Sequence, residues 1–248
     1  MINVFIGYDE GEKVAYSVLA ESIRKHASEP VSITPVSLNN IPKFTREMQD
    51  NQSTQFAFSR FMVPHMSDYK GWSIFMDCDM MFRSDIVELW NMRDSKYALM
   101  CCQHDYTPKQ DIKFRGAKNE PFEKKNWSSM MMFNNELCWQ LTPDYVSNVS
   151  GLQLHQFKWM HHNYEIGSIP LEWNWFVTEY DYNREAKNVH WTLGGPWFND
   201  YKYCDYADEW FKLYHDIIFT EPLISEPGFE VRDTRNDPFK GTSIEGKD

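Results

Sequence analysis

The opening residues constrain the fold most, because they change from a strand pattern to a helix pattern and back. Ile2 to Ile6 form a short apolar run that predicts a buried strand. From Glu10 to His26 the apolar side chains recur at helical spacing, with basic residues in the last turn, where the helix dipole favours them. Val31 to Leu38 then alternate apolar and polar residues, as a second strand does. This order predicts an α/β fold of the nucleotide-binding type.

The turn after the first strand, Gly7-Tyr8-Asp9, has two interpretations. Exposed residues at this place in an α/β fold are natural contacts for a base or a ribose. Alternatively, Asp9 only caps the helix that follows. The full turn reads GYDEGEK, which is more acidic than the glycine-rich basic loop of a nucleotidyltransferase.

A second apolar run, Ser73 to Met76, ends at two acidic residues. Asp77 and Asp79 are two positions apart, so in an extended chain they project to the same side. Two adjacent carboxylates repel each other unless a proton or a cation lies between them, and hard oxygen ligands suit Mg²⁺ or Mn²⁺. The alternative is an Asp-x-Asp sequence that merely begins a turn. Because α/β sheets bind ligands at the carboxyl ends of their strands, we favour a metal site.

Two further polar residues stand in apolar surroundings. Arg60 lies in QFAFSRFMVPHM, a predicted short helix over residues 55–66, so we expect it to meet a carboxylate or a phosphate rather than water. His190 ends the apparent strand AKNVHWT and precedes Gly194 and Gly195. A lone histidine is usually a hydrogen-bonded structural residue, whereas paired glycines let backbone amides approach a phosphate closely.

The remaining pattern predicts three helical regions, two strands and one long basic loop. The helical regions are Ile86–Met92, Leu141–Met160 with breaks at Pro143 and Gly151, and Tyr206–Phe219; the strands are Tyr97–Cys102 and Ser128–Phe133. The loop, residues 103–125, is either a functional lid or a solvated charged segment. His161 and His162 are adjacent, so they point apart and are not expected to bind one metal.

The composition of the chain argues against some classes of function and favours others. A net charge of −11 argues against general nucleic-acid binding, and an anionic substrate would need a metal ion or local cations. The five cysteines form no C-x-x-C motif, which favours reduced thiols in a cytoplasmic protein. The opening residues lack the pattern of a signal peptide, and no apolar run has the length of a membrane span. The many Trp and Tyr residues suit pockets for flat or sugar-like ligands.

Five segments in this order resemble the retaining sugar-nucleotide transferases of glycosyltransferase family eight and its bacterial and viral relatives. They are VFIGYDEGEKVAYSV, FAFSRFMVP followed by FMDCDMMF, SSMMMFNN, IPLEWN and HWTLGGPW, and together they extend from Ile2 to about Trp210. The resemblance implies a GT-A fold, which is a Rossmann-like single α/β domain with a mixed central sheet and an Asp-x-Asp metal site. This domain would cover residues 1–226, followed by a polar tail over residues 227–248.

The resemblance also implies roles for individual residues. Asp77, Asp79 and His190 would hold Mn²⁺ or Mg²⁺, and Arg60, Asp79 and Glu165 would be the catalytic residues. Contacts to the donor are implied for Ile6, Gly7, Tyr8, Asp9, Arg60, Asp77, Cys78, Ser128, Asn134, Gly194 and Gly195. One departure is that Gly195 precedes Pro196 where the family has a lysine, so Lys202 or a lysine of the basic loop would supply that cation.

Together these features predict a metal-dependent glycosyltransferase. It would move a hexose from a UDP-sugar to a sugar, lipid or protein acceptor and retain the anomeric configuration. The alternative is a non-catalytic module of the same fold that binds UDP or a sugar.

Overall fold

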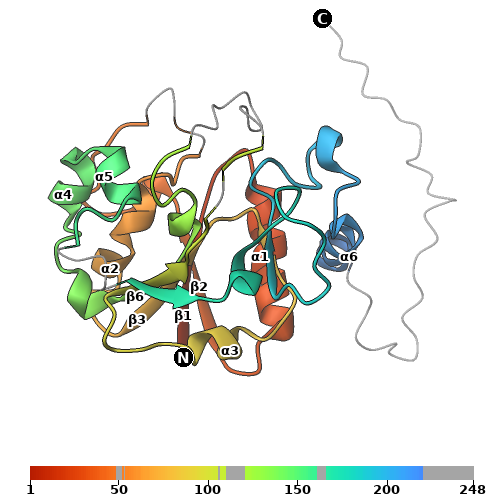
Figure 1. The fold of residues 1–248 in the computed structure, drawn as a ribbon, viewed down its shortest axis with the longest axis horizontal. Coiled ribbons are helices and arrows are strands. Elements are labelled where there is room, and N and C mark those ends of the chain that lie inside the picture. The colour runs from red at the N-terminus through yellow and green to blue at the C-terminus, as the bar shows by residue number, and fades with distance from the viewer. Residues whose placement is uncertain (49–51, 53, 106, 110–120, 161–165, 220–248) are drawn as a thin grey trace, which may run out of the picture.

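The central feature of the fold is a six-stranded mixed sheet in the order β2-β1-β3-β6-β5-β7 (Figure 1). A computed structural model of the chain describes residues 1–48, 52, 54–105, 107–109, 121–160 and 166–219. β1 is parallel to β2 and β3, β6 is antiparallel to β3 and β5, and β5 is parallel to β7. The predicted mixed α/β sheet is therefore confirmed. The strands are β1 Ile2–Gly7, β2 Val31–Val36, β3 Trp72–Met76, β5 Leu99–Cys102, β6 Met130–Asn134 and β7 Ile166–Ile169.

Helices lie at both ends of this sheet. Figure 1 shows α4 and α5 at one end, and α1 and α6 at the other. Helix α1 begins at Lys13 and not at the predicted Glu10, because the backbone carbonyl of Asp9 accepts the Glu12 N–H and holds a separate turn. The α-helices are α1 Lys13–His26, α2 Val63–Met66, α3 Ile86–Trp90, α4 Pro143–Asn148, α5 Gly151–His155 and α6 Ala207–Ile218.

Several predicted elements are shorter or divided in the structure. The segment predicted as one helix over residues 55–66 is a turn, the 3₁₀ helix η2 (Ser59–Met62) and α2. Pro143 and Gly151 stand at the first positions of α4 and α5, after the capping residues Thr142 and Ser150. Proline suits a first helical position because its missing N–H has no partner there. The two residues predicted as breaks are thus helix starts.

A second, three-stranded sheet has the order β4-β9-β8. Its strands are β4 Met80–Phe82, β8 Trp175–Phe176 and β9 Asn188–His190. β4 pairs antiparallel with β9, so that Met80 lies opposite His190. β4 follows the Asp77-Cys78-Asp79 segment directly, and this small sheet therefore brings the end of β9 beside it.

Two hydrophobic clusters fill the interior. The larger one contains β3 and β6, whose residues Ile74, Phe75 and Met130 to Phe133 are fully buried. The smaller one surrounds the small sheet and α6, with Met81, Val189, Trp191 and Trp210. The three consecutive methionines of β6 fill the core, as the sequence predicts. The five cysteines are free thiols and four of them are buried.

Among the described residues, no helix combines the length and the apolar character that crossing a membrane requires.

Replacing a core leucine should cost far more stability than replacing an exposed one. Leu99 is 0% exposed and Leu152 is 52% exposed. Leu99→Ala should lower the free energy of unfolding by about 2–5 kcal/mol, because it removes buried methyl groups and leaves a cavity. Leu152→Ala should change it by about 0.5 kcal/mol or less. Urea denaturation of both variants measures the difference, and equal losses would contradict the position of β5 in the core.

Candidate functional site

Three potential metal ligands converge where the two sheets meet. Asp77 follows β3 directly, Asp79 precedes β4, and His190 is the last residue of β9. One ligand atom from each lies within 4.8 Å of the other two. Asp79 is 8% exposed and His190 is 2% exposed, so the cluster lies largely out of water.

Backbone hydrogen bonds hold this convergence. The Asp77 N–H donates to the carbonyl of Ser129, with 2.8 Å between nitrogen and oxygen. The Trp191 N–H donates to the carbonyl of Asp79 at 2.9 Å, which extends the β4–β9 pairing by one residue. The positions of both aspartates are thereby set by the main chain.

A directed chain of hydrogen bonds sets the proton on His190. The Ser129 hydroxyl donates to the carbonyl of Asn126 at 2.7 Å, so its oxygen accepts from Asn174 Nδ2 at 2.8 Å. Asn174 Oδ1 therefore faces His190 Nδ1, 2.8 Å away, and accepts a hydrogen bond from the Nδ1–H. An imidazole whose Nδ1–H is held in this way presents Nε2 to its ligand.

The chemistry of this donor set fits a divalent metal ion. His190 Nε2 lies 3.1 Å from Asp79 Oδ1, and the two lone pairs would repel without a proton or a cation between them. Adjacent ligands of an octahedral ion with bonds of about 2.1 Å are separated by about 3.0 Å. Two carboxylates and one imidazole suit Mg²⁺ or Mn²⁺. Because a second carboxylate, Asp77, shares the site, a metal ion there would have two carboxylate ligands and one imidazole.

Arg60 makes the buried contact with an anion that the sequence predicts. Its side chain is 7% exposed, and Nη1 lies 2.7 Å from Asp77 Oδ1. The same nitrogen donates to the carbonyl of Ser128 at 2.9 Å. The guanidinium carbon lies 5.3 Å and 5.2 Å from the ring centroids of Phe56 and Phe75. Arg60 is thus held rigidly at the edge of the metal cluster.

The turn after β1 is tied together by Asp9. Asp9 Oδ1 accepts from the Gly11 N–H at 2.8 Å and Oδ2 accepts from the Gln55 N–H at 2.9 Å. The carboxylate therefore connects this turn to the segment that leads to Arg60.

Packing limits what the other residues of this turn can offer a ligand. Ile6 is fully buried, and a Cβ on Gly7 would lie 2.4 Å from the Phe56 ring, so glycine is required there. Tyr8 is half-buried, with its ring in edge contact with Tyr16. Within the Ile6–Asp9 segment, Tyr8 is therefore the residue whose side chain is accessible to a ligand.

The glycines after β9 make room for aromatic rings. A Cβ on Gly194 would lie 2.7 Å from the Tyr201 ring, and one on Gly195 would lie 2.2 Å from the Trp197 ring. Gly194 also has a φ of +134°, which side chains rarely adopt. Its N–H donates to the carbonyl of Trp191 at 3.0 Å. In this conformation the Gly194 amide is engaged within the turn and is not directed at a ligand.

The structure does not bring every predicted residue to the cluster. Asn134 pairs with Trp72 while Met130 pairs with Met76, because β6 runs antiparallel to β3. Asn134 therefore lies at the far end of the strand, which corrects its predicted contact with a donor sugar.

Cys78, for which a contact to the donor is implied, is fully buried, so its side chain has no surface for a ligand. Burial also raises the pKa of its thiol well above the usual value. Glu165, His161 and His162 lie outside the described residues.

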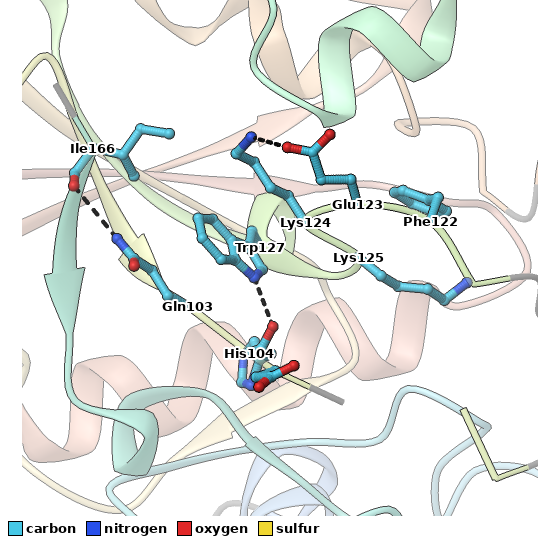
Figure 2. A pocket seen from close by; sticks show the side chains of 9 residues that line it. Gln103, His104, Phe122, Glu123, Lys124, Lys125, Trp127 and Ile166 are labelled. Carbon is cyan, nitrogen blue, oxygen red and sulfur yellow. Dashed lines mark hydrogen bonds and ion pairs between the residues drawn. The ribbon is translucent and has the colours of Figure 1, made fainter. Parts of the chain in front are cut away.

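Two adjoining cavities share Gln103 and Asp105, and the rings of His104 and Phe176 connect the first of them to His190. The first has a volume of about 570 Å³ and is lined by Gln103, His104, Asp105, Phe122, Glu123, Lys124, Lys125, Trp127 and Ile166 (Figure 2). The His104 ring stacks on Phe176 with centroids 3.8 Å apart, and the edge of Phe176 meets His190 at 5.4 Å. Burial lowers the pKa of His104 to about 3, so this imidazole is neutral at physiological pH.

The second cavity has a volume of about 490 Å³ and shares Gln103 and Asp105 with the first. Trp175, Tyr180 and Glu179 are among the residues that line it. Aromatic faces beside carboxylates suit compounds with many hydroxyl groups.

Comparison with known proteins gives one sequence relative and several structural ones. No family model matches the chain. It is 45% identical over 217 residues to Protein CDI of Arabidopsis thaliana, which covers 84% of this chain and 83% of that protein.

The structural relatives are glycosyltransferases of 11–13% identity, a level at which similarity shows the fold, and this fold is GT-A. The apo structure of the bifunctional enzyme WbbM matches with a TM-score of 0.58 over 86% of this chain and 49% of WbbM, so this chain spans about half of that protein. Apo GlyE of Streptococcus pneumoniae TIGR4 matches with a TM-score of 0.55 over 86% of this chain and 60% of GlyE. The galactosyltransferase LgtC, in complex with donor and acceptor sugar analogs, matches with a TM-score of 0.54 over 89% of this chain and 97% of LgtC.

Removing the amide that orients His190 should weaken metal binding. Asn174→Ala leaves His190 without the acceptor that fixes its proton on Nδ1. We expect the Kd for Mn²⁺ to rise by about 10–100-fold, as for other residues that orient a metal ligand. Isothermal titration of Mn²⁺ into the variant measures this, with thermal unfolding as a check on folding. Asn199→Ala, at an exposed asparagine, is the control, and an unchanged Kd in Asn174→Ala would contradict the hydrogen-bond chain.

Proposed function

The chain belongs to the family of Arabidopsis Protein CDI and has the GT-A fold, and we propose that it is a metal-dependent glycosyltransferase that uses a UDP-sugar. The observation that carries this proposal is the cluster of Asp77, Asp79 and His190, with the proton of His190 already set by Asn174. A cluster of this composition at the carboxyl end of a strand in an α/β sheet is suited to a metal-bound diphosphate.

Each residue of the cluster has a part in the proposed reaction. Asp77, Asp79 and His190 would hold Mn²⁺ or Mg²⁺, which when bound supplies a Lewis acid for the negative charge of the leaving UDP. Arg60 keeps Asp77 in place and adds a fixed positive charge near the position where that negative charge develops. Because Arg60 is held by Asp77 and the Ser128 carbonyl before the substrate binds, it needs no reorganisation during the reaction.

We propose a position for each substrate relative to Tyr8, the metal cluster and the two cavities. The uridine would lie against Tyr8, and the hexose would extend from the metal cluster toward the first cavity. The acceptor, a sugar, lipid or protein hydroxyl, would approach through the second cavity along Trp175 and Tyr180. The buried Glu179 carboxylate in its wall would accept hydrogen bonds from such hydroxyl groups.

We also propose that the anomeric configuration is retained. Both carboxylates of the cluster serve as metal ligands in this proposal, so neither is a nucleophile. Attack on the face from which UDP departs needs no covalent intermediate with the protein, unlike the double displacement of many retaining glycosidases.

A second candidate function is a non-catalytic module that binds UDP or a sugar. The engaged amide of Gly194 favours it, since one donor that could stabilise a leaving diphosphate is already used within the turn. Release of UDP that depends on a particular sugar distinguishes an enzyme from such a module.

The proposed enzyme should release UDP from one or a few UDP-sugars in the presence of Mn²⁺. EDTA should abolish the release, because the diphosphate would lose its counter-ion. Asp79→Asn should lower turnover by about 100-fold or more, whereas Asp94→Asn at a partly exposed aspartate serves as the control. A coupled assay for UDP over a panel of donors measures this. UDP binding without turnover of any donor would favour the module, and absence of UDP binding would refute the proposed enzyme.

The shape of Arg60 should matter as well as its charge. Arg60→Lys keeps a cation but cannot contact Asp77 and the carbonyls of Ser128 and Ala57 together. We expect kcat to fall by about 100-fold while the KM for the donor changes less. The lost contacts of the guanidinium would stabilise mainly the charge that develops on UDP in the transition state. Steady-state kinetics with the best donor measures both constants. A variant with wild-type kcat would show that Arg60 has only a structural role.

A further inference from the structure

The two adjoining cavities differ in the charges of the residues that line them. The charged residues of the first cavity are two acids and two lysines, Asp105, Glu123, Lys124 and Lys125. Those of the second cavity are three acids and one lysine, Asp105, Glu179, Asp181 and Lys109. The charges of the first cavity therefore balance, whereas carboxylates outnumber cations by two in the second.

Glu179 is the least accessible carboxylate of the second cavity. It is 4% exposed, whereas Asp105 and Asp181 are exposed. Glu179 Oε2 accepts the Lys109 N–H at 3.3 Å, and the buried Oε1 has no hydrogen-bond partner among the residues that the structure describes. A buried carboxylate is costly unless it is paired. Glu179 therefore favours a positively charged group at this wall of the cavity.

Lys109 does not supply that positive group. Its side chain is exposed, and the contact that the structure shows between it and Glu179 is the backbone hydrogen bond. Within the described part of the chain, the ammonium of Lys109 forms no ion pair with Glu179. The charge of the second cavity is thus left for a ligand to balance.

Aromatic rings form another part of the same wall. The rings of Trp175 and Tyr180 meet edge to face, with centroids 5.1 Å apart and 63° between their planes. Trp175 Nε1 donates to the carbonyl of Asp181 at 3.0 Å, and Tyr180 stacks on Phe176 with centroids 5.1 Å apart. Both rings are thereby held in place. An ammonium group is attracted to the face of an aromatic ring, so rings beside carboxylates favour a cation over a neutral group.

We propose that the second cavity binds an ammonium group, and that the acceptor is therefore a hydroxylated amine. A neutral hydroxyl group can donate a hydrogen bond to a carboxylate, but it cannot reduce the negative charge of the cavity as an ammonium group does. The same charge disfavours the diphosphate of the donor in this cavity. A volume of about 490 Å³ suits a small molecule. The inference rests on the proposed function, because only a transferase has an acceptor.

Three sugars that differ at one position provide the test: glucosamine, N-acetylglucosamine and glucose. Glucosamine carries an amine that is charged at mildly acidic pH, and the other two sugars lack this charge. Isothermal titration of each sugar into the full chain gives its Kd, both without a nucleotide and with UDP and Mn²⁺. We expect glucosamine to bind about tenfold more tightly than the other two, which corresponds to about 1.4 kcal/mol.

Variants show whether this preference comes from the second cavity. Glu179→Gln keeps the shape of the side chain and removes its charge, so the Kd of glucosamine should rise about tenfold while that of glucose stays the same. Glu185→Gln, at an exposed glutamate outside the lining of the cavity, is the control and should bind as the wild type does. Thermal unfolding checks that each variant folds. Should Glu179→Gln fail to fold, Asp105→Asn combined with Asp181→Asn removes two charges at exposed positions and should give a similar loss.

The possible failures are distinguishable. Equal Kd values for the three sugars under both conditions would overturn the inference. A preference for glucosamine that persists in the variants would also overturn it, because the ammonium group would then bind elsewhere. Either result leaves the proposed function intact, since UDP release is measured separately. A preference that depends on Glu179 in a chain that neither binds UDP nor releases it would instead refute the proposed function and leave an ammonium site.

Discussion

The pairing of β4 with β9 is the contact on which the candidate site depends. β3 ends at Asp77, but His190 comes from a distant part of the chain and reaches the aspartates only through this short antiparallel pair. Three-residue strands gain little from their own hydrogen bonds. The smaller hydrophobic cluster, in which Met81 and Val189 pack with Trp191 and Trp210, supplies the stability that the pair needs. Helix α6 thus supports the metal cluster by packing against the small sheet.

Because the metal cluster is buried, its polar contacts determine where its side chains lie. A buried ion pair such as Arg60–Asp77 loses so much hydration that it adds little net stability. Its value lies in position, because the main chain holds both partners: the Ser128 carbonyl accepts from Arg60, and the Ser129 carbonyl accepts from the Asp77 N–H. These bonds fix the ion pair relative to the backbone. That rigidity is what a site needs if it is to stabilise charge as the charge develops.

The sequence predicted those parts of the site that depend on local pattern. An apolar run before Asp77 reads as a strand, and Arg60 among aromatic residues indicates a buried anion as its partner. The series of hydrogen bonds from Asn126 through Ser129 and Asn174 to His190 joins separate segments of the sequence. No local sequence pattern reveals it. The misplaced contact is Asn134, which only the family resemblance implied. The apolar run SSMMMF does not show in which direction its strand runs, so the sequence could not reveal that Asn134 lies at the opposite end from Asp77.

The turn over residues 122–129 contacts both the charged residues of the metal cluster and the first cavity. Its Ser128 and Ser129 carbonyls position Arg60 and Asp77, and its Lys125 lines the first cavity, toward which we propose that the hexose extends. Because hydrogen bonds already hold this turn, a substrate in the first cavity would meet a backbone that is fixed relative to Arg60 and Asp77. One segment of backbone would then set both the lining of the cavity and the position of the charged residues that act on the leaving group.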